Sequence, residues 1–227
     1  MSFDWKGLPV VIFGIGGFSK EVKILIDDIN KYSNIPIFDL KGFVSHIEGT
    51  IGNIIEGLPI VTCNENFVEY ASKFDKLGVV IALGSPHHKE QIERDIFSKC
   101  VNLVYPNLIH PSANITSSES NDFGVGSIIC AGVTVTTNIK FGKFIIVNIN
   151  TTVGHDVTVG DYCTINPLCA ISGNVSIRKG SLIGAGASIR EKLSIGENCT
   201  VGLGAIVVKD VIDNDIIICK RATKLEK

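Results

Sequence analysis

The second half of the chain carries a hydrophobic residue at every sixth position. From Phe123 to Val207 this residue is aliphatic or aromatic without exception. Four positions after each one comes a small or apolar residue, such as Val157 or Ala187. A helix with about 3.6 residues per turn cannot keep this period over such a length. The pattern predicts a parallel β-helix, in which each repeat supplies one short strand and one corner, and three repeats are expected to close a triangular coil.

Glycine often follows the repeated hydrophobic residue, as at Gly154, Gly160 and Gly184. Glycine suits corners where φ is positive or where two backbones approach closely. Ile109 and Ile115 predict an earlier coil, offset by two residues from the later ones. The period of six ends after Val211, so the C-terminal segment is expected to cap the last coil.

The first half has the pattern of an α/β sheet. The apolar run Pro9–Phe13 predicts a buried strand, Gly14–Ser19 a turn and Lys20–Asp28 a helix. A second strand near Gly42–Val44 is expected to join Leu58–Val61 through a hairpin-like connection. Further on we expect a helix over 65–73, a strand over 79–83 and a helix over 88–99. Alternating strands and helices predict an open, mostly parallel sheet, with the domain boundary at 106/107.

Composition narrows the range of functions. The net charge is −2 and 19% of residues are charged, which argues against a nucleic-acid partner. The mean hydropathy of +0.32 is high, yet no run reaches the roughly 18 apolar residues that would span a membrane. The N-terminus lacks the basic start of a secretory signal, so we expect a cytoplasmic protein without a membrane partner. Seven cysteines without a CxxC pair are expected to be small buried hydrophobes rather than ligands or disulfides.

Two short motifs carry candidate chemistry. The strand, glycine turn and helix around Gly14, Gly16 and Gly17 form a potential phosphate site, because backbone N–H groups at a helix start attract anions. Ser19 replaces the third glycine of a dinucleotide motif, so a tight turn without a ligand remains the alternative. His155, the one histidine within the regular repeat, is followed by Asp156 at a corner position. An adjacent acceptor can fix the tautomer of a histidine, although an ordinary surface histidine remains the alternative.

These motifs resemble a known family. The segments FGIGGFSKEV, IALGSPHHKEQI, LIHPSANI and NINTTVGHDVTVGDYC are similar to those of the sialic-acid O-acetyltransferases and sugar-nucleotide N-acetyltransferases, which include the bacillosamine-pathway acetyltransferases. The resemblance implies a Rossmann-like domain for the sugar nucleotide over 1–106. It also implies a left-handed β-helix acetyltransferase domain with a C-terminal cap over 107–227. Acetyl-CoA would lie between adjacent β-helices of a homotrimer, and no metal is implied.

The resemblance also implies roles for individual residues. His155 would be the general base, since the ordinary pKa of histidine suits proton removal from an attacking amine. Asp156 would orient its ring, and the backbone N–H of Gly173 would stabilise the oxyanion. The expected acetyl-CoA contacts are Asn148, Thr164, Gly173, Ala185, Leu203 and Gly204. The expected contacts to the nucleotide sugar are Gly14, Gly16, Gly17, Phe18, Ser45, His46 and Gly84.

The sequence departs from the family pattern at three places. Thr164 stands where many relatives have a second histidine. The segment Gly42–His46 replaces a GFLDD motif whose aspartates contact the nucleotide, which leaves UDP, dTDP and GDP open. The tail Cys219–Lys224 replaces a GNPAK-like segment near the coenzyme adenine.

The function expected from these features is N-acetylation of a nucleotide-linked amino sugar, with a 4-amino-4,6-dideoxy sugar favoured, in polysaccharide or glycan biosynthesis. O-acetylation of a sialic-acid-like sugar is the nearest alternative, because the same base could act on a hydroxyl. A metal-dependent β-helix enzyme needs several histidine ligands, and only His110 and His155 lie in this half. A non-catalytic scaffold or binding module is the remaining alternative.

Overall fold

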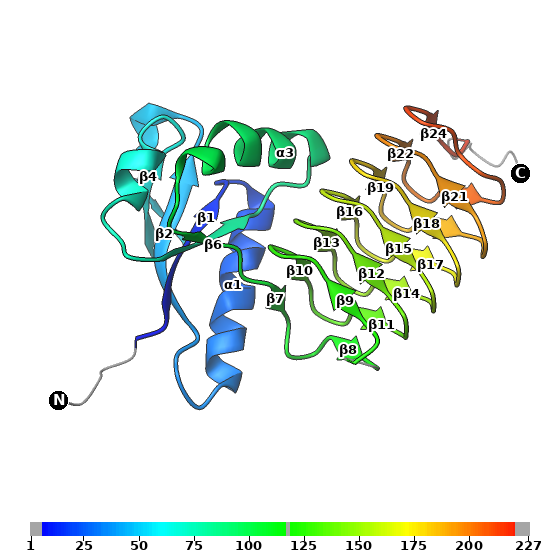
Figure 1. The fold of residues 1–227 in the computed structure, drawn as a ribbon, viewed down its shortest axis with the longest axis horizontal. Coiled ribbons are helices and arrows are strands. Elements are labelled where there is room, and N and C mark those ends of the chain that lie inside the picture. Colours follow the sequence, from blue (N-terminus) through cyan, green and yellow to red (C-terminus); the bar gives the residue numbers. More distant parts are fainter. Residues whose placement is uncertain (1–5, 117–118, 221–227) are drawn as a thin grey trace, which may run out of the picture.

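The computed structural model describes residues 6–116 and 119–220, and places an α/β domain beside a stack of triangular coils (Figure 1). The first sheet has the strand order β3-β4-β2-β1-β5-β6, and every pairing within it is parallel except that of β3 with β4. Its strands are β1 (Leu8–Phe13), β2 (Phe38–Ser45), β3 (Ile54–Ile55), β4 (Leu58–Cys63), β5 (Leu77–Ile81) and β6 (Leu103–Val104). Its helices are α1 (Gly17–Tyr32), α2 (Phe67–Ala71) and α3 (Pro86–Asp95), with 3-10 turns at Glu48–Thr50 and Phe97–Lys99.

One expected connection is different in the structure. β2 and β4 run parallel, and the hairpin is formed instead by the two-residue strand β3 with β4. The chain therefore crosses from the end of β2 back to the start of β4. This crossing brings the carboxyl ends of β1, β2, β4 and β5 to the same edge of the sheet, where open α/β sheets bind their ligands.

Helices cover both faces of this sheet. On one face Leu25 and Ile26 of α1 pack against Val10 and Ile12. On the other face the rings of Phe67 and Phe97 lie 4.7 and 4.9 Å from that of Phe13. Because α1 follows β1 on one face and α3 follows β5 on the other, the order of connections reverses between β1 and β5.

Short parallel strands form the three faces of the β-helix. The first face contains β7 (Leu108–Ile109), β10 (Ile128–Ile129), β13 (Ile146–Val147), β16 (Thr164–Ile165), β19 (Leu182–Ile183), β22 (Thr200–Val201) and β24 (Ile216–Ile217). The second face contains β8 (Asn114–Ile115), β11 (Thr134–Val135), β14 (Thr152–Val153), β17 (Ala170–Ile171), β20 (Ser188–Ile189) and β23 (Ile206–Val207). The third face contains β9 (Asp122–Phe123), β12 (Lys140–Phe141), β15 (Thr158–Val159), β18 (Ser176–Ile177) and β21 (Ser194–Ile195).

The repeated hydrophobic residue fills the interior of the coils. Val153, Ile165 and Ile183, for example, are at most 1% exposed, and so are the following residues Val157 and Ala187. This confirms the inward positions expected from the period of six. Burial of such side chains stabilises each coil by roughly 1.5–3 kcal/mol per residue.

Glycine was expected at the corners for close backbone approach and for positive φ, and the structure assigns these two roles to different corner positions. A Cβ at Gly154 would lie 2.8 Å from the backbone nitrogen of Gly173, so the glycine after each strand permits close stacking of coils. Positive φ occurs two residues further along, where Asn138, Asp156 and Asn174 have φ of 58°, 59° and 59°. Asparagine and aspartate tolerate this left-handed conformation better than most side chains do.

The last coil extends further than the period of six in the sequence indicates. β24 pairs with β22, so the chain still coils at Ile217, six residues beyond Val211. Residues 221–227, the end of the expected cap, lie outside the described part of the chain. The boundary expected at 106/107 falls between β6 and β7, and the division of function between the two domains stays a prediction.

The cysteines largely follow expectation. All seven are free; Cys63, Cys130, Cys163, Cys169 and Cys199 are buried, whereas Cys100 is half-buried. Cys219 is exposed, contrary to the expectation of a buried hydrophobe, because it follows the last strand. None of the helices in the described ranges is long and apolar enough to cross a membrane.

Candidate active site

His155 lies on the edge of the β-helix between the second and third faces. Its side chain is 58% exposed, and its Nδ1 lies 2.7 Å from Oδ2 of Asp156. A carboxylate partner fixes the proton on Nδ1, which leaves Nε2 unprotonated in the neutral ring. The exposed Nε2 is therefore placed to accept a proton from a molecule at this edge.

Asp156 is itself held in place by Asn138, one coil earlier. The Nδ2 of Asn138 donates to Oδ1 of Asp156 at 3.1 Å, while Oδ2 faces the imidazole. The hydrogen bond from His155, and after it that from Asn138, lowers the pKa of the Asp156 carboxyl. Asn138 was not among the residues expected at the site, although its spacing of one coil from Asp156 was a usable signal.

Gly173 lies directly beneath the His155 ring, one coil further on. A Cβ on Gly173 would stand 2.5 Å from Nε2 of His155, so only glycine permits this approach. Within the described ranges, the N–H of Gly173 donates no hydrogen bond. A free backbone donor and a free imidazole nitrogen thus lie side by side at one exposed edge.

Most of the expected acetyl-CoA contacts lie on another edge. Asn148, Ala185, Leu203 and Gly204 all follow strands of the first face and form the edge between the first and second faces. Leu203 is 70% exposed, and Ala185 accepts a hydrogen bond from the N–H of Gly204 at 2.9 Å. Within a single chain, the whole second face therefore separates this edge from His155.

Thr164 does not lie at either edge. Its side chain is 1% exposed, and its Oγ1 accepts a hydrogen bond from Nζ of Lys89 at 2.9 Å. Lys89 belongs to α3, which packs over the first face at this point. The structure thus gives no support to the expectation that Thr164 contacts acetyl-CoA, since its hydroxyl already joins the two domains.

The glycine turn leaves open space at the start of α1. Gly14 has φ of +115°, and a Cβ there would stand 2.7 Å from Oγ of Ser19. By contrast, a Cβ at Gly16 or Gly17 would meet no atom within 4 Å. The backbone N–H groups at this helix start are consequently open to an anion, and the helix dipole favours one.

Three of the other expected nucleotide contacts differ in exposure. Ser45 is fully buried, and its Oγ accepts a hydrogen bond from the N–H of Ile47 at 2.9 Å. Direct contact of Ser45 with a nucleotide is therefore not supported. His46 is exposed, and a Cβ at Gly84 would meet no atom within 4 Å, so both positions are open to a ligand.

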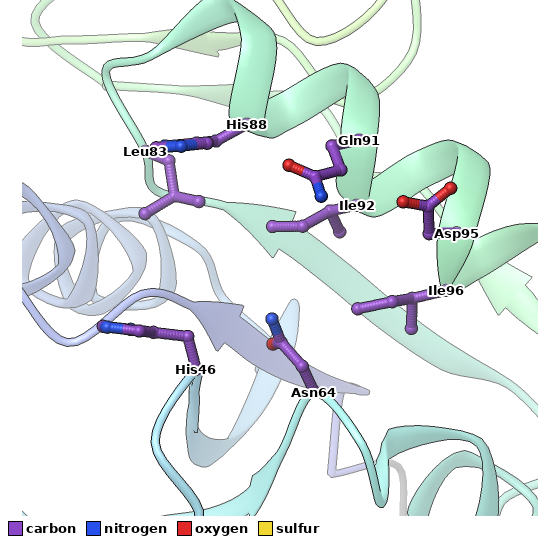
Figure 2. Close-up of a pocket in the computed structure, with 8 residues that line it drawn as sticks. All are labelled: His46, Asn64, Leu83, His88, Gln91, Ile92, Asp95 and Ile96. Carbon is purple, nitrogen blue, oxygen red and sulfur yellow. The ribbon is translucent and has the colours of Figure 1, made fainter.

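His46 lines a cavity of about 350 Å³ at the carboxyl edge of the sheet (Figure 2). Leu83 joins this cavity to the glycine turn, because a Cβ at Gly14 would stand 3.0 Å from its Cδ2. The lining residues are His46, Asn64, Leu83, His88, Gln91, Ile92, Asp95 and Ile96. Apart from His46, sequence reasoning missed the polar members, which come from separate elements and share no motif.

A second, apolar groove of about 280 Å³ lies between α1 and the first–second edge of the β-helix. Phe18, from the glycine turn, forms one end of it, and Ile149, next to Asn148, lies on the β-helix side. The groove therefore connects the glycine turn with the edge that carries the expected coenzyme contacts. Within the part of the chain that the structure describes, no three His, Cys, Asp or Glu residues are grouped to hold a metal ion.

One known family is similar to most of the N-terminal domain. Residues 9–96 match the family of PglD N-terminal domains. No curated protein sequence matches the chain.

Solved structures match nearly the whole length. WeeI from Acinetobacter baumannii AYE is 28% identical, with 93% of this chain and 97% of that chain covered and a TM-score of 0.79. The acetyltransferase domain of PglB from Neisseria gonorrhoeae, solved with acetyl coenzyme A, is 26% identical over 92% of this chain and 95% of that chain, with a TM-score of 0.79. PerB from Caulobacter crescentus, solved with CoA and GDP-perosamine, is 25% identical over 92% of each chain, with a TM-score of 0.77.

These matches confirm several expectations from the sequence. The resemblance to sugar acetyltransferases is confirmed, and so is the fold class of an α/β domain followed by a left-handed β-helix. The expected enzyme class, an acyltransferase, is confirmed by the same neighbours.

Proposed function

We propose that this chain transfers the acetyl group of acetyl-CoA to the amine of a nucleotide-linked amino sugar. The neighbours solved with acetyl coenzyme A and with GDP-perosamine support this class of substrate. The observation that carries the proposal is that Nε2 of His155 lies beside Gly173, whose backbone N–H is free. A 4-amino-4,6-dideoxy sugar remains the favoured acceptor.

His155 acts as the general base in this mechanism. The amine nitrogen attacks the thioester carbonyl carbon, and its proton passes to Nε2 of His155 as the C–N bond forms. Asp156 stabilises the resulting imidazolium through Nδ1, 2.7 Å away. The Gly173 N–H donates to the oxyanion of the tetrahedral intermediate. The C–S bond then breaks and the thiolate of CoA leaves. The proton on Nε2 passes to this thiolate.

The coenzyme site is shared between copies of the chain in this proposal. Asn148, Ala185, Leu203 and Gly204 of one copy hold acetyl-CoA against the edge of another copy that carries His155. Such sharing requires that each chain carry the His155 edge and the coenzyme edge at separate places, and the two edges of this chain are separate. Exposed apolar side chains along the first–second edge and the second face, Leu168, Leu203 and Ile206, at 63%, 70% and 77% exposure, favour burial in an assembly. A homotrimer is the assembly we propose, and its mass in solution tests it.

The N-terminal domain holds the sugar nucleotide in this proposal. Gly16 and Gly17 at the start of α1 bind the diphosphate, and Phe18 directs the sugar into the groove beside Ile149. The amine then reaches the edge where a second copy brings its His155. A cytoplasmic location, expected from the sequence, stays a prediction.

The experiment that tests the function is a thiol-release assay with acetyl-CoA and a panel of acceptors. The panel contains UDP-, dTDP- and GDP-linked 4-amino sugars, a 3-amino sugar and free sialic acid. Turnover on a nucleotide-linked amine, with the product heavier by one acetyl group and stable to mild base as an amide, supports the proposal. Turnover on sialic acid alone would make the chain an O-acetyltransferase, and silence across the panel despite coenzyme binding would contradict an acetyltransferase for these sugars.

A further inference from the structure

The N-terminal domain rests on the first face of the β-helix. The first residue of each two-residue strand points out of the coils, because side chains alternate along a strand. On the other faces such residues are exposed, as Thr152 and Thr158 are. On the first face the equivalent residues Ile128, Ile146 and Thr164 are each 1% exposed. The N-terminal domain therefore covers this part of the first face.

Two helices of the domain hold opposite edges of the first face. α1 lies at the first–second edge, where Oδ2 of Asp28 is 3.1 Å from Nε2 of His110. α3 lies at the edge between the third and first faces, where it contacts residues that follow strands of the third face. The chain itself passes between the two domains once, through residues 105–107. Contacts at the two edges therefore set the tilt of the domain across the first face.

The contacts of α3 at the third–first edge are charged and directional. Nζ of Lys143 donates to Oε1 of Glu93 at 2.8 Å, and the hydroxyl of Tyr162 donates to Oε2 of the same carboxylate. Nζ of Lys179 donates to Oε1 of Glu90 at 2.6 Å. The three partners follow the successive strands β12, β15 and β18, so these two carboxylates of α3 grip three coils of the β-helix.

The same helix also lines the cavity at the carboxyl edge of the sheet. His88, Gln91 and Asp95 of α3 lie on the cavity (Figure 2), whereas Glu90 and Glu93 face the β-helix. α3 therefore connects the cavity of the N-terminal domain directly to the β-helix. A change in how α3 sits on the coils moves this cavity relative to them.

The ion pairs of α3 are suited to setting position rather than stability. Their four side chains are between 23% and 44% exposed, and ion pairs at such exposure contribute little to the free energy of unfolding. Contacts to three successive coils, by contrast, fix the angle of α3 on the β-helix. Position matters for group transfer, because an error of about 1 Å in the placement of a reacting group can lower the rate on the order of 100-fold.

From this arrangement we propose that Glu90 and Glu93 are positioning residues, which hold the N-terminal domain at the tilt that brings the sugar amine to the thioester carbonyl. The glycine turn lies across the first face from these residues, beside the edge that holds acetyl-CoA in the proposed function. A change of tilt therefore moves the bound sugar relative to the thioester. This inference rests on the proposed function and adds to it how the acceptor is placed.

The first test replaces both carboxylates with side chains of similar size that accept no comparable hydrogen bond, in the double variant Glu90→Met/Glu93→Met. With the best nucleotide-linked amino sugar, kcat should fall at least about tenfold, because the amine is misplaced. The Kd of acetyl-CoA and of the nucleotide sugar, each titrated alone by calorimetry, should stay unchanged, because each ligand contacts one domain of a given copy. Circular dichroism checks that the variant is folded.

A matched control removes two ion pairs that lie within the N-terminal domain. Asp27→Leu/Glu69→Met breaks the pairs with Lys23 and Lys73, and it should keep the wild-type kcat. Wild-type kcat in Glu90→Met/Glu93→Met overturns the proposal. A fall in kcat matched by weaker binding of the nucleotide sugar also overturns it, since the two residues would then act in binding.

Reversal of one ion pair tests position without removing charge from the edge. Glu90→Lys sets two ammonium groups against each other at Lys179 and should lower kcat. Glu90→Lys/Lys179→Glu restores an ion pair of opposite sense and should regain at least about threefold in kcat over Glu90→Lys alone. A reversed pair that recovers nothing overturns the proposal.

Failure of this proposal can be told apart from failure of the proposed function. Acetyl transfer by the wild type, with the same kcat in the α3 variants, would refute the positioning role and leave the acetyltransferase standing. A wild type that acetylates no amino sugar would refute the proposed function, and the positioning role with it.

Discussion

Replacing the buried Lys89 with methionine tests how the two domains are joined. Lys89 is fully buried beneath α3. Its Nζ donates to the carbonyl oxygens of Phe144 and Cys163 at 2.9 and 3.1 Å, and to Oγ1 of Thr164 at 2.9 Å. Methionine keeps an unbranched side chain, one atom shorter than that of lysine, but removes all three hydrogen bonds. Within the described part of the chain, the Phe144 carbonyl then has no other donor, whereas the Cys163 carbonyl keeps the N–H of Ile146.

The cost of this change depends on pH. An unpartnered buried polar group costs roughly 1–3 kcal/mol, so Lys89→Met should be less stable than the wild type at pH 8.5. Burial lowers the pKa of Lys89 to about 7. Between pH 7 and the ordinary pKa of lysine, the unfolded chain binds a proton that the folded chain does not. The free energy of unfolding of the wild type, relative to Lys89→Met, should thus rise with pH, by at most about 1.4 kcal/mol per unit.

The assay is denaturant unfolding of both proteins at pH 6.5, 7.5 and 8.5. The cysteine thiols are common to both proteins, including Cys163, whose pKa burial raises to about 11, so their titration cancels in the difference between the two. Lys73→Met is the matched control, since that side chain is 61% exposed, and its stability difference should not vary with pH. A difference between wild type and Lys89→Met that stays flat or shrinks as the pH rises would refute the reasoning.

Three further predictions concern the candidate site, and a fourth concerns the cysteines. Gly173→Ala places a methyl group 2.5 Å from Nε2 of His155, so kcat should fall about 100-fold without unfolding, as circular dichroism can check. Asp156→Asn removes the carboxylate partner of the imidazole and should lower kcat roughly tenfold or more. Because hydrogen bonds lower the pKa of Asp156, its ionisation should not appear in a wild-type pH–rate profile above pH 5. Iodoacetamide at pH 8 should label the exposed Cys219 well before Cys130, whose pKa burial raises to about 12, and peptide mass spectrometry measures the order.

The β-helix was predictable because its constraint is local and periodic. One inward residue in every six, such as Val153 or Ile165, must be apolar for the coil to close, and the sequence records this directly. The same regularity placed Gly173 one coil beyond His155. The parallel pairing of β2 with β4 was not predictable, because parallel and hairpin connections between short apolar runs leave the same pattern.

The contacts between domains had no signal in the sequence. Lys89 lies in the polar helix PHHKEQIERD and reads as a solvated residue until α3 is seen to pack on the β-helix. Thr164 occupies a position expected to face the coenzyme, yet Lys89 covers it. Asn64 and Gln91 converge on one cavity from separate elements, which no spacing along the chain reveals. Long-range packing, rather than local preference, decides each of these.

The most direct test of the central claim compares acetyl transfer by the wild type and by His155→Gln. Release of CoA is followed with the best nucleotide-linked amino sugar, and His87→Gln, on the exposed start of α3, serves as the control. If His155 is the general base, kcat should fall by roughly 10²–10⁴ in His155→Gln, with acetyl-CoA affinity and assembly unchanged and the control active. A folded His155→Gln protein that keeps wild-type turnover would contradict the account.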